Sequence, residues 1–162
     1  MLFLFVSSFS TADIIKNQVE FLSPEEAFQP SIRIITNNHL EVTWDIKQGY
    51  YLYLGMFEFS VDNSDMRIIK VNMPEGKKKK DEFFGDVDVY YNSAKANIYF
   101  DKITSKTNLI LKYQGCADAG LCYPPITKKF SLEQYAENSS YLLKTSSADN
   151  QYSFSERLSQ QS

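Results

Sequence analysis

The stretch that decides the fold is Leu40–Lys47, which reads LEVTWDIK. Apolar and polar residues alternate strictly along it. This period of two predicts a β-strand with one apolar and one polar face, as in an antiparallel sheet with one solvated side. Gln48 and Gly49 interrupt the pattern, and an aromatic strand, YYLYLGMFEFS, is expected over residues 50–60.

Other segments rich in β-branched and aromatic residues recur along the chain, and together they predict seven or eight short strands. Short helices are expected at Ser23–Glu26, where serine precedes proline, and at Ser131–Gln134, which resembles a capping box. Strands without alternating helices favour an all-β fold, which we interpret as an immunoglobulin-like β-sandwich. The remaining strands are expected at Ser31–Thr36, Arg67–Met73, Val87–Tyr91, Ala96–Phe100, Asn108–Gln114 and Ile126–Phe130.

The composition of the chain excludes several classes of function. A net charge of -3 gives no basic field for nucleic acid, so no nucleic-acid partner is expected. No apolar run reaches the roughly 18 residues of a membrane-spanning helix. The only histidine is His39, and neither a zinc-type ligand spacing nor a glycine-rich phosphate loop occurs. We therefore expect no metal and no nucleotide cofactor, and the cysteine pair remains as the chemically distinctive feature.

Cys116 and Cys122 lie in the segment YQGCADAGLCYPP, Tyr113–Pro125, between two expected strands. The segment is expected to form a hairpin with both sulfurs near its tip, where the two sulfurs can meet if the loop folds back. Closing so short a loop stabilises a fold by only about 2 kcal/mol, which favours a role in reactivity. A purely structural disulfide stays open as an alternative, because small exported domains often carry one.

The two ends of the chain differ from its body. Residues 1–12 are interpreted as the remnant of a signal peptide, because the apolar run Leu2–Val6 precedes the small residues Ser10–Ala12. An edge strand or an unstructured start is the alternative. Residues 13–136 are expected to form the domain, and residues 137–162, rich in Ser, Asn and Gln, a polar linker or tail.

The cysteine segment resembles the N-terminal periplasmic domain of the thiol:disulfide interchange protein DsbD. Other pieces resemble this family in the same order over residues 20–135. They are FLSPEEAF at Phe21–Phe28, LEVTWDIKQGYYLY at Leu40–Tyr53, MPEG at Met73–Gly76 and DEFFG at Asp81–Gly85. The resemblance implies an immunoglobulin-like β-sandwich with a redox-active cysteine hairpin.

The resemblance also implies a function. Members of the family accept electrons from a thioredoxin-like domain and pass them to periplasmic disulfide isomerases or cytochrome c maturation thioredoxins. The implied activity is that of a protein-disulfide reductase without a cofactor, located in the periplasm. Full-length relatives would continue into transmembrane helices and a thioredoxin-like domain, and these 162 residues contain neither.

The motif match assigns roles to single residues. Cys122 corresponds to the cysteine that forms mixed disulfides with partners, and Cys116 to the cysteine that resolves them. Phe83 corresponds to the aromatic residue of a cap loop that covers the pair, with Asp81 and Glu82 beside it.

Three more residues are expected at the site. Tyr51 and Tyr53 match tyrosines that lie near the cysteines in the family, and Asp118 lies between the two cysteines in the sequence. If Asp118 and the two acidic cap residues lie close to the sulfurs, their charges should raise the pKa values of the thiols and keep the reduced pair unreactive. The cap would then open only against a partner.

Two questions stay open from the sequence. The lysine run Lys77–Lys80 is interpreted as a solvated turn, with the docking of acidic partners as the alternative. The alternative to a redox function is an immunoglobulin-like binding module with a structural disulfide. A reduction potential below roughly -300 mV would favour that alternative.

Overall fold

The computed structural model describes residues 20–104 and 106–133, so the expected signal remnant and the polar tail lie outside the described residues. Two short helical turns accompany eleven strands in this part of the chain. In chain order the elements are α1 (Pro24–Ala27), β1 (Phe28–Thr36), β2 (His39–Ile46), β3 (Tyr50–Tyr53), the 3-10 turn η1 (Leu54–Met56), β4 (Glu58–Val61), β5 (Ile68–Asn72), β6 (Lys77–Asp81), β7 (Gly85–Tyr90), β8 (Ser93–Phe100), β9 (Asn108–Tyr113), β10 (Gly115–Ala117) and β11 (Ile126–Ser131).

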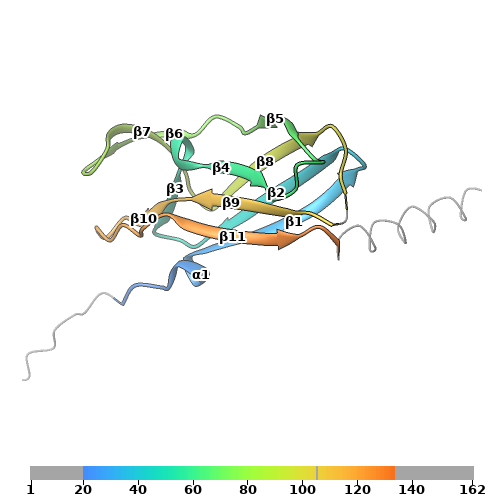
Figure 1. Ribbon diagram of the computed structural model, residues 1–162. Coiled ribbons are helices and arrows are strands. Elements are labelled where there is room, and N and C mark those ends of the chain that lie inside the picture. Colours follow the sequence, from blue (N-terminus) through green and yellow to red (C-terminus); the bar gives the residue numbers. More distant parts are fainter. Residues whose placement is uncertain (1–19, 105, 134–162) are drawn as a thin grey trace, which may run out of the picture.

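The strands form three antiparallel sheets, with the orders β1-β2-β8-β5, β11-β9-β4 and β10-β3-β7-β6. The first two sheets lie face to face as the layers of a sandwich, and the third forms one end of the molecule, on the left in Figure 1. The expected all-β, immunoglobulin-like β-sandwich is therefore confirmed.

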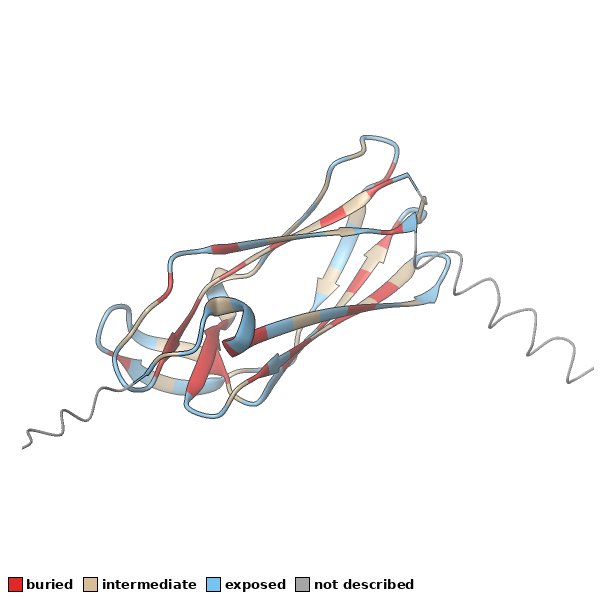
Figure 2. Cartoon of the chain, turned by 90° about the horizontal axis from the view of Figure 1, so that it is seen from below, coloured by how far each residue is buried: buried red, intermediate tan, exposed pale blue. Residues whose placement is uncertain are grey.

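Trp44 of β2 lies at the centre of the core. Its ring makes edge contacts with Phe57 and with Tyr113 of β9, at centroid separations of 4.9 and 5.7 Å. These contacts join the two layers of the sandwich. Figure 2 shows buried residues alternating with exposed ones along the strands, as the period of two predicts. The apolar residues of β2 are all buried: Leu40, Val42, Trp44 and Ile46.

The helix α1 begins as its sequence predicts. The Ser23 hydroxyl accepts a hydrogen bond from the Glu26 amide, and the Glu26 carboxylate accepts one from the Ser23 amide. This capping box satisfies amides that a helix leaves without partners. The second expected helix, Ser131–Gln134, is only partly described, and Ser131 there ends β11. No helix in residues 20–104 and 106–133 is long and apolar enough to cross a membrane.

The aromatic stretch of residues 50–60 is two strands, not the single strand that its composition predicts. The 3-10 turn at Leu54–Met56 separates β3 from β4. β3 pairs with β10 and β7, whereas β4 pairs with β9 in another sheet. The turn thus carries the chain from the end sheet to the sandwich, which strand propensity alone does not reveal.

The lysine run is also not the solvated turn that we expected. Lys77–Asp81 forms β6, which pairs with β7 and lies at the edge of the end sheet. Lysine is depleted in strands generally, but edge strands favour it because its charge prevents pairing with other chains. The turn lies after β6, at residues 82–84.

Candidate functional site

Cys116 and Cys122 form a disulfide at the β10 end of the molecule, with their Cα atoms 4.0 Å apart. Cys116 is 1% exposed, whereas Cys122 is only partly buried. β9 and β11 pair as the hairpin prediction requires. Between them, however, the chain crosses to the end sheet, where Cys116 pairs with Tyr51 of β3. The disulfide therefore lies against a sheet rather than at the tip of a free hairpin.

Two glycines make this path possible. A Cβ at Gly115 would collide with the carbonyl oxygen of Tyr51 and with the side chains of Phe28 and Leu52, so only glycine lets β10 lie so close to β3. Gly120 has a φ of +95° in the turn between the cysteines, which glycine adopts without strain.

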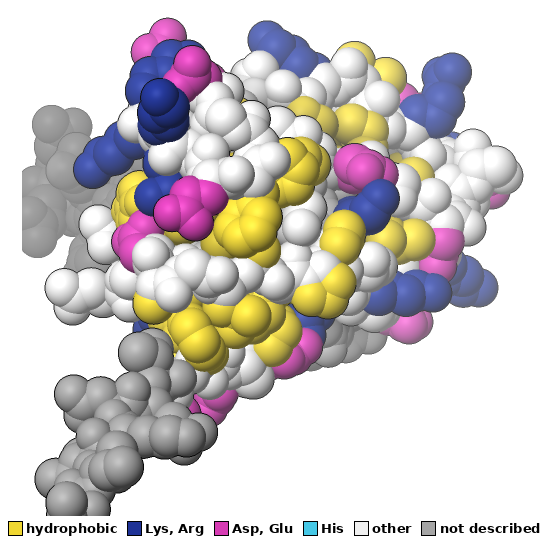
Figure 3. Space-filling model, turned by 90° about the vertical axis from the view of Figure 1, so that its left-hand side faces the viewer, with side chains coloured by type: hydrophobic (Ala, Val, Ile, Leu, Met, Phe, Trp, Pro, Cys, Tyr) yellow, Lys and Arg dark blue, Asp and Glu magenta, His cyan; other side chains and the backbone are white. Residues whose placement is uncertain are grey.

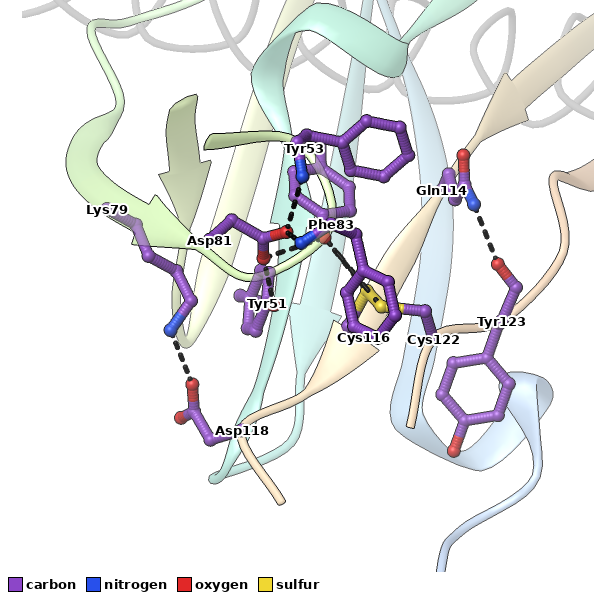
Figure 4. Close-up of a disulfide and its surroundings, with 11 residues drawn as sticks. Tyr51, Tyr53, Lys79, Asp81, Phe83, Gln114, Cys116, Asp118, Cys122 and Tyr123 are labelled. Atoms are coloured by element: carbon purple, nitrogen blue, oxygen red, sulfur yellow. Dashed lines mark hydrogen bonds and ion pairs between the residues drawn. A yellow bond between two sulfur atoms is a disulfide. The ribbon is translucent and has the colours of Figure 1, made fainter. Parts of the chain in front are cut away.

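Two tyrosine hydroxyls meet one buried carboxylate beside the disulfide, as Figure 4 shows. Tyr51 and Tyr53 donate to Oδ2 of Asp81 at 2.6 and 2.8 Å. The Tyr53 hydroxyl oxygen also lies 3.0 Å from Cys116 Sγ and 3.7 Å from Cys122 Sγ. Tyr53 is thus the direct contact between the cap residue Asp81 and the sulfurs.

The other oxygen of Asp81 holds the cap turn. Its Oδ1 accepts hydrogen bonds from the amides of Phe83 and Phe84, at 2.8 and 3.1 Å. Burial pushes the pKa of Asp81 upward, but the hydrogen bonds from Tyr51, the two amides and Tyr53 outweigh it and hold that pKa below its ordinary value. The carboxylate is therefore ionised at neutral pH.

The tyrosines keep their protons. Burial raises the pKa of Tyr53 to about 12, with a further contribution from Asp81. Burial and the hydrogen bond to Asp81 raise the pKa of Tyr51 far above its ordinary value. Both side chains therefore act as hydroxyl groups at neutral pH, and the negative charge of the cluster resides on Asp81.

The cap turn presents two exposed aromatic rings. Phe83 is 59% exposed and Phe84 is 46% exposed. Figure 4 draws the Phe83 ring across the disulfide. The Phe84 ring packs edge-on against Tyr53, with centroids 5.1 Å apart. The family resemblance assigned the cap to Phe83, and the ring that packs against a tyrosine of the site is that of Phe84.

A hollow of about 340 Å³ opens between the cap turn and the cysteine loop. Tyr51, Glu82, Phe83 and Asp118 line it, so these expected site residues share one surface. Figure 3 looks onto this end of the molecule and shows hydrophobic side chains gathered across it, with basic and acidic side chains at the upper left and around the edge.

Lys79 is a site residue that sequence analysis did not single out from its run. Its ammonium group donates to Asp118 at 3.0 Å and to the Tyr91 hydroxyl at 3.1 Å, and it lies 4.5 Å above the Tyr51 ring. The hydrogen bond to Tyr91, with that to Asp118, raises the pKa of Lys79. Residues two apart in a strand point to the same face of the sheet. The position of Lys79 two residues before Asp81 could therefore have indicated that both side chains face the site.

Comparison with known proteins places these features in one family. The family profile described as "Thiol:disulfide interchange protein DsbD, N-terminal" matches residues 18–134. A Pseudomonas aeruginosa protein named thiol:disulfide interchange protein DsbD 1 is 39% identical over 114 residues, 70% of this chain and 19% of that protein. The Escherichia coli protein DsbD is 34% identical over 120 residues, 74% of this chain and 20% of that protein. The chain thus spans about a fifth of the length of these relatives.

Two solved structures from Neisseria meningitidis resemble the chain. The reduced DsbD N-terminal domain superposes with a TM-score of 0.61 at 34% identity, covering 67% of this chain and 86% of that domain. The same domain in complex with the PilB N-terminal domain gives 0.60 at 32% identity, covering 70% and 88%.

Proposed function

The chain belongs to the family of N-terminal domains of the thiol:disulfide interchange protein DsbD, and we propose that it passes electrons between proteins through the Cys116–Cys122 pair. The observation that carries this proposal is the asymmetry of the disulfide. Cys116 is 1% exposed, whereas Cys122 is only partly buried and is the more accessible cysteine of the two. Thiol–disulfide exchange requires one sulfur that a partner reaches and a second that resolves the mixed disulfide.

The exchange begins when a thiolate of a reduced donor attacks Cys122 Sγ. The Cys116–Cys122 bond breaks, Cys116 leaves as a thiolate, and a mixed disulfide forms between Cys122 and the donor. The second thiolate of the donor then attacks the donor sulfur of the mixed disulfide. This step releases the Cys122 thiolate and leaves the donor with a disulfide. Two electrons reach this chain, and the two thiolates take up protons according to the pH.

The reduced chain passes the electrons on by the same chemistry in reverse. The Cys122 thiolate attacks the disulfide of an oxidised partner, and Cys116 then attacks Cys122 Sγ and releases the partner with both thiols reduced. In this sense the domain acts as a protein-disulfide reductase. The Tyr53 hydroxyl lies 3.0 Å from Cys116 Sγ, but its single proton is donated to Asp81, so it can donate to a Cys116 thiolate only by releasing that carboxylate.

We infer the partners from the family. A thioredoxin-like domain would supply the electrons, and periplasmic disulfide isomerases or cytochrome c maturation thioredoxins would receive them. The solved complex of a 32% identical domain with the PilB N-terminal domain supports a protein partner as one side of the exchange. The periplasm is the corresponding proposed location, because a disulfide persists in an oxidising compartment.

Equilibration in redox buffers tests this function. A reduction potential in the range of thioredoxin-like proteins, roughly -120 to -270 mV, would support the exchange. A potential below roughly -300 mV, with no electron transfer from a reduced thioredoxin-like protein, would overturn it and favour the binding module with a structural disulfide.

A further inference from the structure

The cap hairpin, β6–β7, is attached to the rest of the domain by few backbone contacts. Within the described residues, β7 pairs with β3 through Leu52–Tyr90 and Tyr53–Val89. β6 lies at the edge of that sheet and pairs with β7. Side-chain contacts from β6 therefore decide how firmly the hairpin is held over the disulfide.

Lys79 makes such contacts across the hollow. Its ammonium group pairs with Asp118, which lies in the turn between Cys116 and Cys122, and the Tyr91 hydroxyl donates to the same Asp118 oxygen at 2.8 Å. The Lys79 side chain is 25% exposed and the Asp118 side chain 44% exposed, so the pair is only partly shielded from water. One cation thus joins the free edge of the cap hairpin to the cysteine loop, as Figure 4 shows.

The neighbouring lysine shows what is particular to Lys79. Lys78 pairs with Asp88 at 2.8 Å, but both residues belong to the cap hairpin itself, and the Lys78 side chain is 86% exposed. That pair bridges two strands that are already joined, whereas the Lys79–Asp118 pair bridges two separate parts of the site.

We propose that the Lys79–Asp118 ion pair is a latch that holds the cap hairpin against the cysteine loop and so sets how often the cap opens. Lys79 is a positioning residue: it acts through the cap turn, which begins three residues later. The inference rests on the proposed function in one respect, because cap opening matters for catalysis only if partners reach the disulfide. The latch itself is measurable in the oxidised chain without any partner.

Amide hydrogen exchange reports cap opening directly, because the Phe83 and Phe84 amides are held by Asp81. We expect Lys79→Gln to speed exchange at these two amides by about two- to fivefold, which is the range that an ion pair of this exposure supports. Lys78→Gln is the matched control, since it removes an equal charge from the next residue, and it should leave both amides unchanged. Lys79→Arg should restore protection.

A double-mutant cycle separates the latch from a general charge effect. Asp118→Asn should speed exchange as Lys79→Gln does, and the two together should do little more than either alone. Raising the salt from about 0.05 to about 0.5 M should speed exchange in the unaltered chain and not in Lys79→Gln. Equal exchange in the Lys79→Gln and Lys78→Gln variants, or additive effects of the two latch mutations, would overturn the proposal. A failed electron transfer with intact latch behaviour would instead count against the proposed function alone.

Discussion

The hydroxyl oxygen of Tyr53 lies 3.0 Å from Cys116 Sγ. The same hydroxyl donates to Asp81, which in turn holds the two amides of the cap turn. The buried sulfur, the tyrosine and the cap are therefore linked, first by a close contact between Tyr53 and the sulfur and then by the hydrogen bonds of Asp81. A change at any of these groups should affect both the reactivity of the pair and the order of the cap.

The roles of the two cysteines give the first prediction. Cys116→Ser should leave Cys122 able to form a lasting mixed disulfide with a partner, because the resolving thiol is gone. Cys122→Ser should trap little, since the remaining sulfur of Cys116 is 1% exposed. Non-reducing gels after incubation with an oxidised thioredoxin-like protein measure this. If Cys122→Ser trapped the partner and Cys116→Ser did not, Cys116 would be the cysteine that partners attack and Cys122 the resolving one.

The disulfide should not be required for folding. It closes a short loop, with a separation of six residues, and so contributes only about 2 kcal/mol, against a typical total of roughly 5–15 kcal/mol. The core around Trp44 lies in the sandwich layers and does not depend on the bridge. We expect the reduced chain to unfold cooperatively at a moderately lower temperature. Loss of a cooperative calorimetric transition on reduction would favour a structural bridge.

Gly115 should tolerate no side chain. Gly115→Ala places a methyl group against the backbone of Tyr51 and the ring of Phe28, and separating β10 from β3 should cost about 1–3 kcal/mol. Gly55→Ala is the control, because Gly55 is exposed and a Cβ added there would meet nothing within 4 Å. Denaturant unfolding measures both variants. If Gly115→Ala and Gly55→Ala had similar free energies of unfolding, β10 would be able to move away from β3 without loss of stability.

The sequence predicted the strand Leu40–Lys47, its buried face and the pairing of the strands that flank the cysteines, because each depends on local alternation or on short separations. It did not predict that β6 is a strand, since a lysine run has no apolar alternation. Nor did it predict the contact of Lys79 with Asp118, which are 39 residues apart and meet only through the pairing of the end sheet. Family resemblance named most of the site residues, and the geometry showed which of them touch.

Acid should weaken the domain through Asp81. Hydrogen bonds hold the pKa of this carboxyl below its ordinary value of 3.8, so its stabilising contribution is complete above that value and is lost as the pH falls through the lower folded-state pKa. Asp81→Asn should reduce stability at neutral pH by about 1–3 kcal/mol and flatten the dependence on acid. Thermal unfolding between about pH 2 and pH 7 compares the two chains.

The same variant should change the chemistry of the reduced pair. Removing the negative charge of Asp81 should favour the thiolate and speed alkylation by a neutral reagent at fixed pH. Asp45→Asn is the control, because Asp45 is an exposed residue of β2 in the sandwich that pairs with Lys47. If the thermal stabilities of Asp81→Asn and of the unaltered chain fell equally with decreasing pH, the ionised Asp81 carboxylate would not stabilise the fold as argued above.

The cap gives the last prediction, in which its two phenylalanines act differently. Phe83 is 59% exposed, and a large exposed ring is unfavourable unless it covers something. Phe83→Ala should therefore speed alkylation of the reduced pair by a small neutral reagent while changing global stability by less than about 0.5 kcal/mol. Phe84 packs on Tyr53, so Phe84→Ala should remove an aromatic contact worth about 0.5–1.5 kcal/mol and speed amide exchange in the cap turn. Shielding and anchoring are thus separable: the first variant changes reactivity without loosening the turn, and the second loosens the turn itself. If neither variant changes the alkylation rate, the cap does not shield the sulfurs, and Tyr53 and Asp81 alone must account for any restraint on the reduced pair.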